Sequence, residues 1–100
     1  MTKILLDMNT PRFQKQLFSL EKVEQRSLLN TLDKIIKLSW NNFYQDKGIR
    51  WEIIISETSE TIKTYSFRFS KKYRGIAYRD GDYLVLLDLY VNHDGAYKKL

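Results

Sequence analysis

The chain has 100 residues, of which 43% are hydrophobic and 29% charged, and its formal net charge is +5. This length predicts a single domain over residues 1–100 with a modest core. The sequence contains no cysteine, which excludes disulfides, thiolate metal sites and a cysteine nucleophile and fits a cytoplasmic protein. The chain has no run of about 18 apolar residues and no signal-peptide pattern, so we expect no membrane span. The cationic surplus favours a polyanionic partner such as nucleic acid, the ribosome or an acidic protein.

The first forty residues predict one strand and two helices. Residues 3–8 form a short apolar run that is typical of a strand. Thr10 and Pro11 then indicate a helix start, because the Thr10 hydroxyl can accept from first-turn amides and proline suits the first helical position. Apolar residues recur at helical spacing in a first helix (Phe13, Leu17, Leu20) and in a second, over residues 21–39 (Leu28, Leu29, Leu32, Ile35, Ile36). We expect each set to form a buried face, with the break between the helices near residues 19–21.

The remaining sixty residues predict a loop and four strands. Residues 40–50 are expected to form a loop, and residues 51–55 a strand with Trp51 on one face and Glu52 on the other. Residues 63–69 alternate strictly, which indicates one packed face and one open face. The packed set is Tyr65, Phe67 and Phe69, and the open set is Thr64, Ser66 and Arg68.

The last strands follow in hairpin order. Residues 73–79 and 83–91 are joined by Asp80-Gly81, a strong hairpin signal. The run at 83–91 is almost entirely apolar, so we expect a central strand that is covered on both sides. Residues 92–97 close the sheet. The sequence therefore predicts an α+β fold of order β-α-α-β-β-β-β, with two helices on one face of a mainly antiparallel four- to five-stranded sheet. The opposite face should be open and carry Arg68.

Five cations within a dozen residues form a candidate phosphate-binding set: Arg68, Lys71, Lys72, Arg74 and Arg79. The planar guanidinium of arginine binds phosphate oxygens well. The alternative is a solvated basic rim that only aids solubility.

Four further side chains are candidates for a functional or structural role: His93, Glu52, Tyr97 and Asp88. His93 could act as a general acid or base, or could cap the end of the sheet by bonding to Asp94 or the backbone. Glu52 could be a base or could pair with an arginine such as Arg68. Tyr97 is available for base stacking, whereas three other tyrosines are expected to pack (Tyr73, Tyr78, Tyr90). Asp88 is expected to pair with a cation.

The sequence predicts neither a metal site nor a cofactor. One histidine and scattered carboxylates do not form a ligand set. There is also no glycine-rich phosphate loop, dinucleotide fingerprint or Ser-His-Asp spacing.

Four segments together resemble the RelE/ParE superfamily of toxins from type II toxin–antitoxin systems. They are G-I-R-W-E-I-I at 48–54, Y-S-F-R-F-S-K-K-Y-R at 65–74, R-D-G-D-Y-L at 79–84 and N-H-D-G-A-Y at 92–97. The resemblance covers essentially the whole chain in length and element order. It implies an mRNA interferase of the RelE-like branch, which is a ribosome-dependent endoribonuclease that needs no metal. In such an enzyme the 2′-hydroxyl of the RNA attacks the adjacent phosphate.

The resemblance also implies roles for individual residues. Arg68 would hold the scissile phosphate, Lys71 and Lys72 would contribute charge or guide the RNA, and Arg74 and Arg79 would add further charge. The terminal His93 and Tyr97 would supply acid–base chemistry or stacking. Glu52 lies where some members have a glutamate base.

The same resemblance implies partners and leaves alternatives open. The partners would be a cognate antitoxin protein and mRNA on the ribosome. A ParE-like inhibitor of DNA gyrase shares the fold, and a non-catalytic binding homologue is a third possibility. The oligomeric state and codon preference do not follow from the sequence.

Overall fold

The computed structural model describes residues 3–49, 51–53, 63–93 and 96–99, and only the backbone is described for residues 53, 91–93 and 96–99. Three helices, α1 (Pro11–Ser19), α2 (Lys22–Ile36) and α3 (Trp40–Gln45), follow the first strand, β1 (Leu5–Asp7). The other described strands are β2 (Glu52–Ile53), β3 (Thr64–Arg68), β4 (Tyr73–Asp80), β5 (Tyr83–His93) and β6 (Ala96–Lys99).

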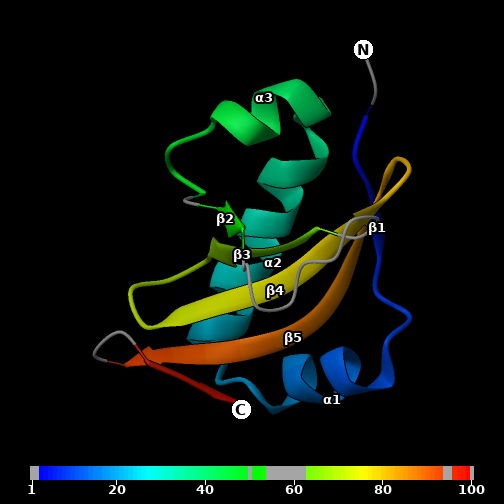
Figure 1. Cartoon of the computed structure of the whole chain (residues 1–100). Coiled ribbons are helices and arrows are strands. Elements are labelled where there is room, and N and C mark those ends of the chain that lie inside the picture. The colour runs from blue at the N-terminus through cyan, green and yellow to red at the C-terminus, as the bar shows by residue number, and fades with distance from the viewer. Residues whose placement is uncertain (1–2, 50, 54–62, 94–95, 100) are drawn as a thin grey trace.

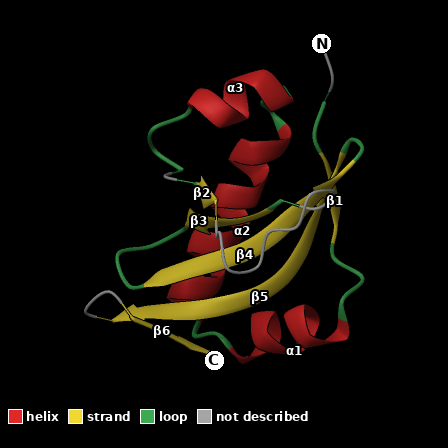
Figure 2. Cartoon of the chain, in the orientation of Figure 1, coloured by secondary structure: helices red, strands yellow, loops and turns green. Residues whose placement is uncertain are grey.

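These strands form one sheet in the order β1-β5-β4-β3-β2, and β6 also pairs with β5. Only the β1–β5 pairing is parallel among the described strands. Helix α2 crosses behind the sheet, α1 lies beside β5, and α3 lies near β2 (Figure 1). Coloured by element type, the view in Figure 2 shows α2 behind the strands and α1 next to β5 at the edge of the sheet. The predicted α+β class and mainly antiparallel sheet are confirmed.

The core lies between α2 and the sheet. Leu28, Leu32 and Ile35 of α2 are buried there against residues of β3, β4 and β5. The predicted stripe on this helix is too wide, because Leu29 is 48% exposed and Ile36 is 41% exposed. Only the residues nearest the centre of the stripe reach the sheet.

Residues 40–45 form helix α3, so the prediction of a loop here is wrong. The Ser39 hydroxyl accepts a hydrogen bond from the Asn42 amide at 3.2 Å and caps the helix. Trp40 and Phe43 lie three residues apart and are both buried. The indole Nε1 of Trp40 donates to the Asp82 carbonyl at 3.2 Å, which fastens α3 to the β4–β5 hairpin. Tertiary packing of two aromatic rings explains this short helix better than helix propensity does.

Helix α1 begins at Pro11 as predicted, but the Thr10 side chain makes no capping hydrogen bond. The most informative residue of α1 is Gln16, which is 7% exposed. Its Oε1 accepts from the Leu89 amide at 2.8 Å, and its Nε2 donates to the Leu89 carbonyl at 3.5 Å. On this edge of β5, β1 pairs with residues 83–85 and β6 with residues 90–93. The Gln16 amide therefore replaces a strand partner in the gap between them.

The alternation in β3 is confirmed, but the prediction of an open second face is wrong. Phe67 and Phe69 join the core, whereas Thr64 is 4% exposed and Ser66 is 1% exposed on the other face. Ile76, directly opposite Ser66, is 3% exposed. We call this side of the sheet the distal face. The β4–β5 turn is confirmed as a tight hairpin with Gly81 at φ +60°.

Candidate functional site

Strand register brings three candidate residues to the distal face. Arg68 of β3 lies directly opposite Arg74 of β4. Glu52 of β2 lies opposite Ser66, two positions before Arg68 on β3. Directly opposite residues of an antiparallel pair share a face, and so do alternate residues of one strand. Two cations and one carboxylate are therefore side by side.

Arg74 is a buried cation with few partners. Its side chain is only 9% exposed, and its Nη1 donates to the Ser66 hydroxyl at 3.0 Å. Its Nη2 lies 3.7 Å from Oε1 of Glu52, whose side chain is 66% exposed. Its Nε is buried and has no hydrogen-bond partner in the described part of the chain. The guanidinium is thus held in place while part of its donor capacity is unused.

Arg68 is fixed at the end of β3 and is half-buried. Its Nε donates to the Ser70 carbonyl at 3.1 Å, and its amide donates to the Ile49 carbonyl at 2.8 Å. Within the described residues, no acceptor binds its two Nη atoms. The next turn is held by the Ser70 hydroxyl, which accepts from the amides of Lys72 and Tyr73. Lys71 and Lys72 are both exposed at this turn, so three cations follow one another along it.

The segment before β2 is ordered by Asp46. Its Oδ1 accepts from the amides of Gly48 and Ile49 and pairs with Lys34 at 3.3 Å. Burial raises the pKa of Asp46, but the hydrogen bonds from Ile49, Lys34 and Gly48 outweigh it and leave the pKa below its usual value. Because Ile49 bonds to the Arg68 amide, this turn positions the segment beside the two arginines.

Arg79 lies away from this cluster. It is five residues after Arg74 on a strand that alternates, and it therefore lies on the helix-facing side, opposite Leu84. Its guanidinium carbon lies 4.1 Å from the centroid of the Trp40 ring. Its Nε donates to the Gly81 carbonyl at 2.7 Å and its Nη1 to the Tyr44 hydroxyl at 3.0 Å. These contacts give Arg79 a packing role at α3.

An aromatic group lies between α3 and β2. Trp51 is half-buried, stacks on Phe43 with a centroid distance of 6.0 Å, and meets the edges of Tyr44 and Tyr65. Burial, followed by a hydrogen bond with Tyr44, raises the pKa of Tyr65 to about 12. Sequence analysis predicted neither this group of packed rings nor the hydrogen bond that Arg74 donates to Ser66. The adjacency of Trp51 to Glu52 was the available signal for the first.

The two terminal candidates are only partly described. His93 pairs with Ala96, and Tyr97 pairs with Asn92, through backbone register between β5 and β6. The side chains of His93 and Tyr97 lie outside the described residues, so their predicted roles stay predictions. Asp88 pairs with Arg12 of α1 at 3.3 Å, which confirms the predicted cation partner.

No family model, curated protein or solved structure matches the chain. Among the described residues, no three His, Cys, Asp or Glu side chains gather as a metal ligand set. None of the helices there combines the length and apolar character needed to cross a membrane. Glu52, Arg68 and Arg74 form the candidate functional site on the distal face.

Proposed function

We propose that the protein is an endoribonuclease that binds the RNA backbone at Arg68 and Arg74 and cleaves it without a metal. In this proposal it is the cytoplasmic toxin of a type II toxin–antitoxin system and acts on mRNA in the ribosome. The resemblance to RelE-like toxins and the cationic distal face support the same conclusion.

The observation that supports this function best is the pairing of two arginines on adjacent strands. Like charges directly opposite each other destabilise a sheet. A buried arginine with an unpartnered donor adds a desolvation cost. The only carboxylate that the described ion pairs bring to these arginines is Glu52, at 3.7 Å from Arg74. An additional anion would relieve this arrangement, and a phosphodiester matches the fork of donors on each guanidinium.

The proposed reaction assigns a role to each group. Glu52 removes the proton from a 2′-hydroxyl, whose oxygen attacks the adjacent phosphorus. The two guanidinium groups stabilise the charge that builds on the phosphoryl oxygens. The bond to the 5′-oxygen breaks, and that oxygen takes a proton from His93 or Tyr97. The products are a 2′,3′-cyclic phosphate and a 5′-hydroxyl, with Lys71 and Lys72 guiding the neighbouring backbone.

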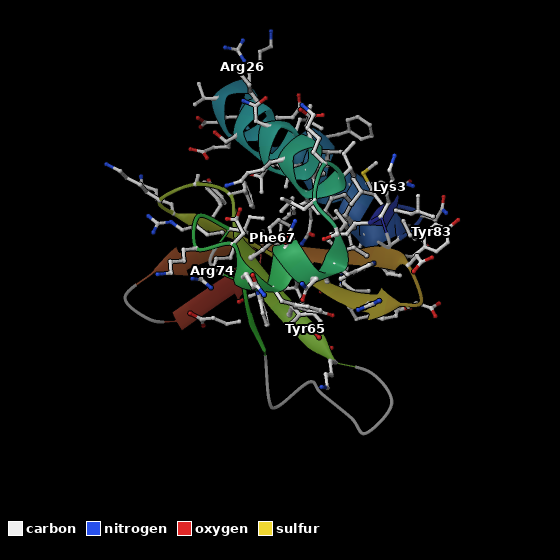
Figure 3. The ribbon with its side chains drawn as sticks, turned by 90° about the horizontal axis from the view of Figure 1, so that it is seen from above. Lys3, Arg26, Tyr65, Phe67, Arg74 and Tyr83 are labelled. Atoms are coloured by element: carbon white, nitrogen blue, oxygen red, sulfur yellow. The ribbon has the colours of Figure 1, made fainter. Side chains whose placement is uncertain are left out.

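The test is primer extension on mRNA in a translating extract to which the purified protein is added. We expect cuts with wild-type protein. Arg74→Gln or Arg68→Gln should reduce the cleavage rate by about 100-fold or more, as expected for loss of a charge-stabilising group. Glu52→Gln should reduce it by a similar factor. The matched control is Arg26→Gln, because Arg26 is exposed on α2 and projects away from the sheet that holds Arg74 (Figure 3).

The outcomes separate the competing functions. If folded Arg68→Gln and Arg74→Gln proteins cleaved at the wild-type rate, the proposed site would be wrong. Intact mRNA together with inhibited supercoiling by purified gyrase would indicate the ParE-like function. Intact mRNA with retained RNA binding would indicate a non-catalytic module, which the existing ion pair between Glu52 and Arg74 also fits. A small acidic protein encoded by the neighbouring gene would be the expected antitoxin.

A further inference from the structure

A hollow of about 520 Å³ lies between the end of α3 and β2. Lys47, Trp51, Glu52 and Arg74 are among its lining residues. Its volume falls within the range of about 300–1,000 Å³ that is usual for small-molecule sites. It is therefore large enough for one nucleotide.

We propose that this hollow binds one nucleotide of a single-stranded RNA, with its phosphate at Arg74 and its base against Trp51. The proposal rests on the proposed function and adds to it the position where a base is held. It makes Trp51 a binding residue and leaves the cleavage chemistry to the groups already described.

The cation side of the hollow is set before a ligand arrives. The hydrogen bond from Nη1 to Ser66 fixes the Arg74 guanidinium, so little side-chain freedom remains to be lost on binding. Its contact with Glu52 is long at 3.7 Å, and the Glu52 side chain is 66% exposed. A phosphate oxygen can take the place of that carboxylate at Nη2. Lys47, which is exposed at the rim, adds a second positive charge.

On the aromatic side of the hollow, Trp51 packs against other rings. The Trp51 ring is inclined by 16° to Phe43, and it meets Tyr44 and Tyr65 at 64° and 82°. Three neighbouring rings hold the indole, yet it remains half-buried and lines the hollow. An aromatic ring and a guanidinium that line the same hollow match the two parts of a nucleotide, because bases stack on aromatic side chains in single-stranded RNA sites. Inorganic phosphate or a phosphorylated sugar would bind Arg74 but would have no base to stack on Trp51.

The other tryptophan offers an internal comparison. Trp40 is 3% exposed and its ring is covered by Arg79. A ligand in the hollow should therefore quench the emission of Trp51 and leave that of Trp40 unchanged.

The test uses the full chain and a fluorescent 2′-O-methyl RNA hexanucleotide, which cannot be cleaved because its 2′-oxygens are blocked. Anisotropy titrations are run with this probe and with an abasic version of the same backbone. We expect wild-type protein to bind the abasic probe about 5- to 150-fold more weakly, which is the span that loss of one stacking contact produces. Trp51→Leu should weaken binding of the intact probe by a similar factor and leave binding of the abasic probe unchanged. Trp51→Tyr, which keeps an aromatic ring, should lose much less.

Measurements on wild-type protein keep the test valid if Trp51→Leu fails to fold. Adenosine monophosphate should displace the probe at a lower concentration than inorganic phosphate or ribose 5-phosphate, and probe binding should quench tryptophan emission. Equal binding of the intact and abasic probes, no quenching, or no binding of either probe would overturn the nucleotide site. Absence of mRNA cleavage with Trp51-dependent binding would refute the proposed nuclease alone. Cleavage with Trp51-independent binding would refute the nucleotide site alone.

Discussion

Replacing Gln16 with alanine should destabilise the fold far more than the same replacement of Gln14 on the same helix. Gln16 is nine-tenths buried, and its amide bonds to both backbone groups of Leu89, which is itself fully buried. Alanine fills the helix position well but leaves the Leu89 N–H and C=O without partners. This loss occurs between the β5 segments that pair with β1 and with β6.

The size of the effect follows from the two hydrogen bonds. A buried donor or acceptor without a partner costs about 1–3 kcal/mol. The bond to the Leu89 N–H is short at 2.8 Å, whereas the bond to its C=O is long at 3.5 Å, so the second contributes less. We expect Gln16→Ala to lower the free energy of unfolding by about 2–3 kcal/mol. In a domain of this size that corresponds to a fall in Tm of roughly 10–20 °C.

Gln14 provides the control on the same helix. Its Nε2 donates to the Met8 carbonyl at 2.7 Å, but the residue is exposed. Gln14→Ala should change the free energy of unfolding by about 0.5 kcal/mol or less. Urea unfolding of both variants gives the comparison, and hydrogen exchange should show faster opening at the Leu89 amide only in Gln16→Ala. If the two variants were equally stable, the view of Gln16 as a substitute strand partner would be wrong.

Three further predictions concern the sheet and α3. Gly75→Ala should lower the free energy of unfolding by about 1–3 kcal/mol in urea titrations, because a Cβ there would lie 2.3 Å from Cζ of the buried Phe67; wild-type stability would contradict this. The pKa of Tyr65 is raised to about 12, so the folded state keeps a proton that the unfolded chain releases near pH 10. The stability that the protonated Tyr65 contributes should be intact below pH 10 and lost between pH 10 and 12. Thermal melts across this range should therefore show a smaller fall in Tm with pH for Tyr65→Phe than for wild type. Arg79→Leu should lower the free energy of unfolding by about 1–3 kcal/mol and red-shift Trp40 emission while RNA affinity stays unchanged, and a selective loss of RNA affinity would restore Arg79 to the binding site.

Sequence patterns predicted the elements in which apolar residues recur at a regular helical or strand spacing. The alternation through Phe67 and Phe69 placed β3 correctly, and Asp80-Gly81 marked the hairpin. Helix α3 was missed because it has only 6 residues, so Trp40, Phe43 and Tyr44 repeat at helical spacing for less than two turns. Its capping serine at position 39 was a readable signal.

The positions of Arg79, Gln16 and Ser66 depend on how the strands pair, not on a local sequence pattern alone. Strand alternation already predicts that some of the five cations lie apart, and the odd spacing of five residues does place Arg79 and Arg74 on opposite faces. By contrast, Gln16 sits on a helix pattern like any surface glutamine. Its burial depends on a gap along the edge of β5 that no local pattern reports. Similarly, Ser66 becomes the anchor of Arg74 only once β3 and β4 pair in this register.

The buried charge on the distal face is expected to lower the stability of the sheet. A sheet that only had to fold would gain from an apolar residue in place of Arg74, since well-packed apolar groups often replace buried charges without loss of stability. This chain instead buries a guanidinium beside Ile76, fixes it with Ser66 and sets it directly opposite a second arginine. Lys71 and Lys72, which lie in the turn between β3 and β4, are exposed and add further positive charge. Local features that weaken a fold are expected where binding or chemistry requires them. A bound anion would offset the positive charge that Glu52 leaves uncompensated, and in the proposed function that anion is an RNA phosphate.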